Sequence, residues 1–236
     1  MKIDFHVHTN TSPCSDLTIT KVIKKALLED LSAIAICNHD KKFDLSEIPY
    51  ELEEKLGIKI NPKNHCKNAF YIFSGVEKSC ALGHLLTVEL GNDILTVIAH
   101  PFERHKDYIK RSQELNAVKS CFMAVECGSG RANYKNKSAC DMAKRFAVEQ
   151  SLPICAGSDA HFEYEIGNAW TEIPDSYGVE GIKEAILNGK AKIYYKNEKR
   201  VTVAKSQIHK SGYTFKSLTF LIYCYIRDIG DKICQR

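Results

Sequence analysis

The sequence contains no CxxC pair among its ten cysteines and no apolar run of the roughly 20 residues that a transmembrane helix requires. It also lacks an internal repeat, a low-complexity linker and a signal-peptide pattern ahead of the first strand-like run. Without CxxC spacing, a structural zinc site on cysteines is disfavoured. Several cysteines lie inside apolar runs such as AIAIC and LPICAG. We therefore expect reduced, mostly buried thiols in a cytoplasmic protein.

The composition is that of an ordinary folded protein. The chain has 236 residues, of which 44% are hydrophobic and 26% charged, and this balance excludes both a disordered chain and a coiled coil. The formal net charge is +4, which is too small to indicate nucleic-acid binding by itself but suits an anionic substrate. No stable complex with nucleic acid is expected.

Short apolar runs alternate with helical patterns over the first 195 residues, and this alternation predicts a parallel α/β sheet. The pattern suits either a barrel or a doubly wound open sheet. Strands are predicted at 2–8, 31–37, 69–77, 84–90, 94–100, 121–126, 152–158 and 190–195. Helices are predicted at 19–30, 51–58, 105–118, 136–151 and 179–189.

The chain changes character after residue 195. A basic stretch, KNEKR, is followed by the apolar and aromatic run FKSLTFLIYCYI at 215–226. We therefore divide the chain into a barrel domain at 1–195 and a C-terminal extension at 196–236. The run at 215–226 predicts a helical tail packed on the barrel. Contact of 215–226 with a membrane surface or a partner is the less favoured alternative.

Histidines and carboxylates gather at the ends of the predicted strands. In a parallel α/β fold the carboxyl ends of the strands meet on one face, where active sites form. The side chains of His6 and His8 point to the same side of their strand and can reach one metal ion. His84 is the exception, because it begins its strand. Burying so many ionisable groups is costly unless a metal ion compensates, so the sequence predicts a metal site.

An ordered set of motifs resembles the PHP (polymerase and histidinol phosphatase) family. The motifs are DFHVHTNTS…SD, NHD, GVE, HLL, AHP and GSDAH, and they extend from Asp4 to about Tyr195. The resemblance implies a distorted (β/α)7 TIM-like barrel that binds up to three metal ions. Mixed nitrogen and oxygen ligands suit zinc, manganese or iron, so two to three divalent transition-metal ions are expected.

The resemblance also implies the ligand set. The first metal ion is expected on His6, His8, Glu77 and Asp159. The second shares Glu77 and adds His84 and His100, and the third is expected on Asp16, His39 and His161. Glu77, Asp159 and His161 are also expected to act in catalysis.

Three features of the sequence differ from the family's motifs or have no assigned role in them. Asn38 occupies the place of an aspartate in the usual TDHD motif, so we expect tuned rather than abolished metal binding. The run LEDLSAIAI lacks the glycine that relatives usually carry before the second strand, which should affect only a turn. Glu126 matches a strand-terminal glutamate of the family, and the sequence leaves open whether it touches metal.

The implied activity is hydrolysis of a small phosphomonoester, a nucleotide or a short oligonucleotide by a metal-activated hydroxide. Arg104 and Arg131 are the expected substrate-binding residues, because a phosphate group needs basic side chains nearby. Histidinol-phosphate or phosphotyrosine phosphatase activity is the alternative within the enzyme class. A non-catalytic, metal-loaded phosphate-binding module is the alternative outside it.

Overall fold

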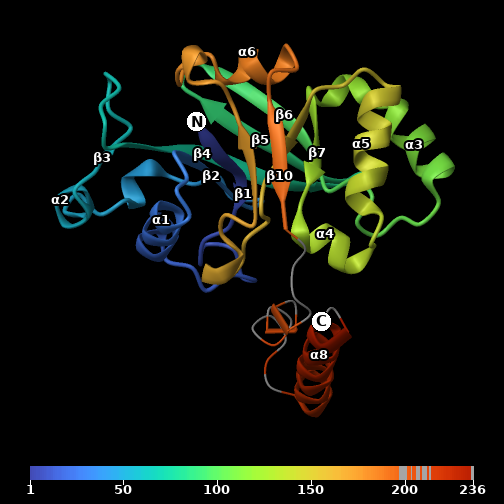
Figure 1. The fold of residues 1–236 in the computed structure, drawn as a ribbon. Helices are drawn as coiled ribbons and strands as arrows, with labels where there is room; N and C mark the ends of the chain where they lie inside the picture. The colour runs from blue at the N-terminus through green and yellow to red at the C-terminus, as the bar shows by residue number, and fades with distance from the viewer. Residues whose placement is uncertain (197–200, 203, 206–207, 209–211, 213, 235–236) are drawn as a thin grey trace.

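The computed structural model describes residues 1–196, 201–202, 204–205, 208, 212 and 214–234, with side chains up to Arg227. Strands and helices alternate along part of the barrel domain, and a long helix follows it (Figure 1). The strands are β1 (Lys2–Val7), β2 (Ala33–His39), β3 (Lys59–Ile60), β4 (Ala69–Cys80), β5 (Gly83–Leu90), β6 (Asp93–Ala99), β7 (Ala124–Gly128), β8 (Ile154–Ala156), β9 (Ala169–Glu172) and β10 (Lys192–Tyr195). The helices are α1 (Ile19–Leu28), α2 (Leu52–Leu56), α3 (Tyr108–Asn116), α4 (Gly130–Lys135), α5 (Ala139–Glu149), α6 (Ile182–Leu187) and α8 (Phe215–Cys234).

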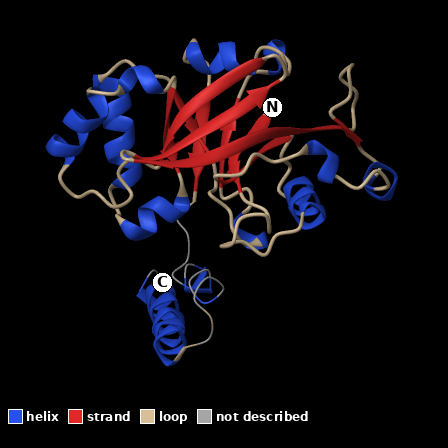
Figure 2. Ribbon diagram, turned by 180° about the vertical axis from the view of Figure 1, so that it is seen from behind, coloured by secondary structure: helices blue, strands red, loops and turns tan. Residues whose placement is uncertain are grey.

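The main sheet curls into a nearly closed, distorted barrel with helices around it, as predicted (Figure 2). Its strand order is β10-β9-β1-β2-β4-β5-β6-β7-β8. The sheet is mixed rather than parallel throughout, because β5 runs antiparallel to both β4 and β6, and β9 antiparallel to β1 and β10. A two-residue turn between β4 and β5 allows only an antiparallel pair.

Side-chain contacts and a close backbone approach complete the barrel between β8 and its neighbours. The Thr171 hydroxyl of β9 accepts a hydrogen bond from the Ala156 amide at 2.8 Å and donates one to the Ala156 carbonyl at 3.1 Å. The next residue, Gly157, lies so close to β1 that a Cβ there would come within 2.5 Å of the His6 backbone nitrogen. The end of β8 therefore lies directly against the end of β1.

Three apolar clusters support this arrangement. One contains alternate residues of the barrel strands, among them Ile3 and Phe5 of β1, together with α6. A second packs α1 against β1, β2 and β4, and a third packs α3 and α5 against β6 and β7. Alternation along β1 sends Phe5 into one cluster and Val7 into another. No disulfide joins the nine cysteines whose side chains are described, and six of them are buried.

The C-terminal extension forms the predicted helix, α8, which lies away from the sheet beyond the end of β1 (Figure 1). Only part of it is covered: Cys224 is fully buried, whereas Phe215 is 86% exposed. The division of the chain at residue 195 and the packing of the extension on the barrel stay predictions. Within the described part of the chain, none of the helices combines the length and the apolar character that a membrane span requires.

Candidate metal centre

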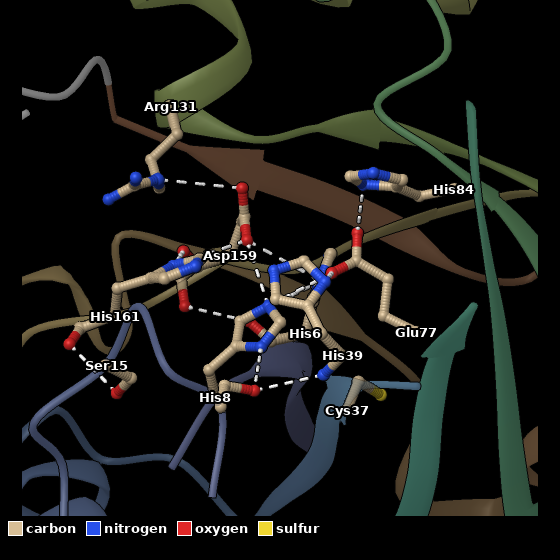
Figure 3. A network of polar contacts seen from close by, with 12 residues as sticks. His6, His8, Ser15, Cys37, His39, Glu77, His84, Arg131, Asp159 and His161 are labelled. Atoms are coloured by element: carbon tan, nitrogen blue, oxygen red, sulfur yellow. Dashed lines mark hydrogen bonds and ion pairs between the residues drawn. The ribbon is translucent and has the colours of Figure 1, made fainter. Parts of the chain in front are cut away.

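The structure brings eight of the nine predicted ligands to one end of the barrel (Figure 3). They come from the carboxyl ends of strands, from the loop after β8, and from the start of β5. His84 joins them because β5 is antiparallel, so that its first residues lie beside the carboxyl ends of β4 and β6. The antiparallel direction of β5 thus explains why His84, which begins its strand, still lies with ligands that end theirs. The eight residues are His6, His8, His39, Glu77, His84, His100, Asp159 and His161.

The first predicted group, His6, His8, Glu77 and Asp159, is assembled and buried. The two histidine Nε2 atoms are 3.1 Å apart, and the Nε2 atom of His8 is 3.4 Å from Glu77 Oε2 and 3.2 Å from Asp159 Oδ1. Ligand atoms that bind one tetrahedral ion at about 2.1 Å lie roughly 3.4 Å from one another. The spacing of these four side chains therefore fits a single transition-metal ion.

The second predicted group shares Glu77 with the first. Glu77 Oε1 lies 2.7 Å from His84 Nδ1 and 3.2 Å from His100 Nε2. Glu77 Oε2 faces the other way, 3.5 Å from His6 Nε2 and 2.9 Å from His39 Nδ1. The two oxygens of one carboxylate thus point into two adjacent ligand groups, as a carboxylate that bridges two ions must do.

The third group consists of His8, His39 and His161, so His8 stands where Asp16 was predicted. Asp16 is exposed and lies in none of the ligand groups. Its neighbour Ser15 is buried and donates a hydrogen bond to the His161 carbonyl (Figure 3). Ser15 therefore points inward, while Asp16 is exposed. The prediction that Asp16 joins His39 and His161 is therefore not supported by the geometry.

The same loop instead brings the thiol of Cys14 into hydrogen-bond contact with His39. This contact and the neighbouring Glu77 carboxylate raise the pKa of His39 to about 10. Cys14 is not part of any of the ligand groups. The cluster therefore presents nitrogen and oxygen donors alone.

Hydrogen bonds behind the cluster determine which ring nitrogen of His161 and of His8 carries a lone pair. A carbonyl oxygen can only accept, so His161 Nδ1–H donates to the Asp159 carbonyl at 2.8 Å and leaves Nε2 as an acceptor. The Ser12 hydroxyl donates to Asn38 Oδ1 and accepts from the His39 amide, both at 3.0 Å. The Ser12 hydroxyl oxygen also accepts a hydrogen bond from His8 Nδ1–H at 3.2 Å. The proton of His8 is therefore on Nδ1, and its Nε2 is free to bind a metal ion.

Asn38 therefore performs the task expected of the missing aspartate. Its Oδ1 accepts hydrogen bonds from the Thr9 amide at 2.8 Å and from Ser12. An amide oxygen serves these donors without bringing another negative charge into a site rich in carboxylates. The substitution thus preserves the orientation of His8 through Ser12.

Burial and the neighbouring carboxylates shift the pKa values of His8 and His6 in opposite directions. Burial lowers the pKa of His8 to about 4, which keeps its ring neutral and able to bind metal. Burial also opposes the charged form of His6, but Glu126 and Glu77 outweigh it and hold the His6 pKa well above the ordinary value. Glu77 Oε2 is buried and accepts no well-aligned hydrogen bond. A buried carboxylate oxygen without a donor, surrounded by imidazoles, is what a bound cation would satisfy.

Glu126 lies behind the ligands and supports two of them. Its Oε1 lies 3.0 Å from His6 Nδ1, the ring nitrogen opposite the one that faces Glu77. Its Oε2 accepts a hydrogen bond from the His100 amide at 2.9 Å. Glu126 therefore orients His6 and His100, although it also lies close enough to both to count among metal-competent groups.

The two predicted substrate arginines have contrasting environments. Arg131, in α4, is buried, and its Nε lies 3.6 Å from Asp159 Oδ2. The Arg104 side chain is 75% exposed and lies 3.5 Å from Glu103. Arg104 lines a small cavity of about 90 Å³ together with His84 and His100. Both arginines thus border the cluster, one from inside the protein and one from the solvent side.

Glu165 is a central residue that the sequence had not revealed. Its Oε1 lies 2.6 Å from Arg131 Nη1, and its Oε2 accepts hydrogen bonds from the His161 amide at 2.6 Å and the Phe162 amide at 3.0 Å. It is fully buried, and that burial raises its pKa even though Arg131 opposes the shift. A carboxylate four residues after His161, in DAHFEYE, was the available signal.

A family model and a protein of known sequence match parts of the chain. A family model described as PHP-associated matches residues 137–191, which include Asp159 and His161. The uncharacterized protein MJ0417 of Methanocaldococcus jannaschii is 23% identical over 194 residues, covering 74% of this chain and 71% of that protein.

Two solved structures share the fold. PsfC from Pseudomonas syringae PB-5123 has a TM-score of 0.55 at 17% identity and covers 89% of this chain and 97% of its own. An amidohydrolase from Chromobacterium violaceum, with bound sulfate and no metal, has a TM-score of 0.56 at 14% identity and covers 80% and 97%. The ordered ligand motifs, the barrel that gathers them and the PHP-associated match over residues 137–191 together support assignment of the chain to the PHP family.

Proposed function

We propose that the protein is a phosphoesterase that binds two to three divalent ions of zinc, manganese or iron and hydrolyses a small phosphomonoester, a nucleotide or a short oligonucleotide. The observation that carries this proposal is the Glu77 carboxylate, whose two oxygens face two adjacent ligand groups. Adjacent ions on a shared carboxylate suit the displacement of an oxygen from phosphorus, where both the attacking and the leaving oxygen need charge stabilisation.

The donor set supports the choice of metals. The three groups offer imidazole nitrogens and carboxylate oxygens, a mixture that suits zinc, manganese and iron better than magnesium or calcium. When bound, such ions lower the pKa of water to near neutrality and neutralise the charge of a phosphoryl group. The protein contributes by holding the ligands in place and by adding positive charge at the edge of the cluster.

The chain's own residues divide these tasks. Glu77 and Asp159 keep the ligand groups together, and His161 presents its Nε2 because its Nδ1 proton is committed to the Asp159 carbonyl. Arg131 is fixed by Glu165 with its guanidinium beside Asp159, so its charge is available to phosphate oxygens next to the first group. Arg104 approaches from the solvent side and is suited to contact the exposed part of a substrate.

A phosphatase screen with added manganese, zinc or iron tests this proposal. The substrates are nucleotides, short oligonucleotides, sugar phosphates, histidinol phosphate and phosphotyrosine. We expect metal-dependent release of phosphate, and we expect His8→Ala to abolish it while lowering the metal content. His65→Ala is the matched control, because His65 contacts Tyr71 outside the cluster.

Metal binding has an independent readout in thermal stability. A ligand that binds only the native state stabilises it, by about 2.7 kcal/mol at a concentration of 100 times its Kd. Added manganese or zinc should therefore raise the Tm of the wild type and of His65→Ala but not that of His8→Ala. Binding of a phosphoester without turnover under any of the three metals would instead favour a phosphate-binding module.

A further inference from the structure

Helix α8 exposes a continuous apolar face. Phe215, Leu218, Ile222 and Ile226 follow the spacing of one helical stripe and are 86%, 41%, 59% and 63% exposed. The opposite side carries Cys224, which is fully buried. The helix thus has one covered side and one uncovered apolar side. A contiguous apolar face of this kind marks a surface for binding another molecule.

The sequence before and along this stripe is basic. From residue 199 to 227 it contains no aspartate or glutamate, whereas Lys and Arg recur at 199, 200, 205, 210, 216 and 227; Asp228, Asp231 and Lys232 follow the stripe in the last part of α8. The whole chain has a net charge of only +4, so this segment carries more positive charge than the rest of the chain can balance. An apolar stripe within a segment free of acids complements an anionic surface.

Two tyrosines flank the stripe. Tyr223 and Tyr225 are 53% and 45% exposed. A tyrosine combines an apolar ring with a polar hydroxyl and is enriched at the boundary between water and lipid. A convex helix face with aromatic flanks and basic charges suits the surface of a bilayer better than a pocket of a protein partner.

We propose that α8 docks the protein on an anionic lipid surface, with Phe215, Leu218, Ile222 and Ile226 in the interface and Lys216 and Arg227 facing lipid phosphates. The helix lies beyond the end of β1, the end of the barrel at which the metal cluster is found (Figure 1). Docking through α8 therefore brings the mouth of the barrel close to the membrane surface. This inference stands apart from the proposed phosphoesterase activity and does not depend on it.

Cosedimentation of the full chain with vesicles tests the docking. The vesicles contain phosphatidylcholine alone or phosphatidylcholine with about 30% phosphatidylserine. We expect binding to the anionic vesicles only, weakening as salt is raised. The variant Ile222→Glu/Ile226→Glu should bind roughly 100-fold more weakly, because it places charge in the apolar stripe.

The matched control is Leu28→Glu/Ile109→Glu. It makes the same change of charge at apolar side chains that are 79% and 70% exposed on α1 and α3 of the barrel, and it should bind like the wild type. Lys216→Gln/Arg227→Gln leaves the stripe intact and should weaken binding roughly 30-fold, at about 1 kcal/mol for each charge.

Two results would overturn the docking. One is binding of the wild type to anionic vesicles that is no stronger than its binding to neutral vesicles or than the binding of Ile222→Glu/Ile226→Glu. The other is an oligomer that this variant dissociates, seen by light scattering, together with no vesicle binding. In that case a second copy of the chain covers the stripe.

Discussion

At the mouth of the barrel, charged side chains are buried, whereas on α8 apolar side chains are exposed. His6 and Glu77 are fully buried, while Phe215 on α8 is 86% exposed. Each region departs from the usual distribution of polar and apolar groups, and in opposite directions. Buried charge needs a compensating ion or partner, and exposed apolar surface needs a cover. The two regions are therefore suited to different ligands: the buried cluster to a cation, and the exposed face of α8 to the lipid surface that we propose.

The largest expected effect comes from removing the shared carboxylate. Glu77→Ala deprives two ligand groups of an oxygen at once. We expect the metal content to fall by more than one ion per chain and kcat/KM to drop about 1000-fold or more. Elemental analysis and steady-state kinetics measure these two effects. If Glu77→Ala keeps its full metal content, Glu77 does not bridge the two ligand groups. Its buried charge then needs another explanation than a bound cation.

Arg131 should have the next largest effect. Arg131→Ala removes a charge that persists into the transition state and should cost about 2–4 kcal/mol, or roughly 30- to 1000-fold in kcat/KM, with the metal content unchanged. Arg131→Lys should restore only part of the rate, since an ammonium cannot replace the planar guanidinium. The exposed Arg104 should have a smaller effect when replaced by Ala.

A folding defect is the main confounding effect for Arg131, because Arg131→Ala leaves Glu165 buried without its cationic partner. The double variant Arg131→Ala/Glu165→Gln removes this unpaired charge. It should regain thermal stability without regaining activity. Wild-type rates in the arginine variants would assign phosphate binding to other groups.

Glu165 should have an intermediate effect, since it acts on Arg131 and His161 rather than on substrate. Glu165→Gln retains the shape of the side chain but loses its charge, and we expect kcat/KM to fall about 10- to 100-fold. A metal content equal to that of the wild type would separate this role from a general loss of the site. Kinetics of Glu165→Gln identical to the wild type would show that Arg131 needs no support.

Asn38 should have a graded effect that depends on its oxygen. Asn38→Asp keeps an acceptor for Thr9 and Ser12 and should change metal affinity less than about tenfold, whereas Asn38→Leu removes the acceptor and should weaken it about 10- to 100-fold. Titration with manganese or zinc measures both. Equal affinities for the two variants would show that the chain from Asn38 through Ser12 to His8 does not orient the ring.

The smallest effect on kcat/KM is expected from substitutions on α8. Ile222→Glu/Ile226→Glu alters only exposed side chains of α8, so kcat/KM for a dissolved substrate should change less than about twofold, within the range of ordinary surface substitutions. Steady-state kinetics without vesicles measure this. A large loss of activity would mean that α8 takes part in the metal centre after all.

Sequence patterns predicted the alternating elements and most of the cluster, because ligands at strand ends converge wherever such strands form one barrel. They could not predict the direction of β5, since period-two alternation is the same for parallel and antiparallel strands. His84 was therefore identified through motif order and not through position. Asp16 lies outside the ligand groups because the direction of its loop depends on the contact of Ser15 with His161, 146 residues away, which no local pattern records.

Other features depend on contacts that no local pattern records. The pairing of Glu165 with Arg131 joins residues 34 positions apart, and in the sequence Glu165 looks like an ordinary surface charge. The helical periodicity of 215–226 predicted α8 correctly. It could not show which side of the helix would be covered, because a stripe has the same spacing whether or not it meets a partner.

Anomalous diffraction from crystals grown with manganese tests directly whether Glu77 joins two adjacent metal sites. Because the two oxygens of Glu77 face different ligand groups, we expect two separate manganese peaks beside them. One should lie near His6, His8 and Asp159, and the other near His84 and His100. A protein that binds no manganese at these positions, and likewise no zinc or iron, would contradict this expectation.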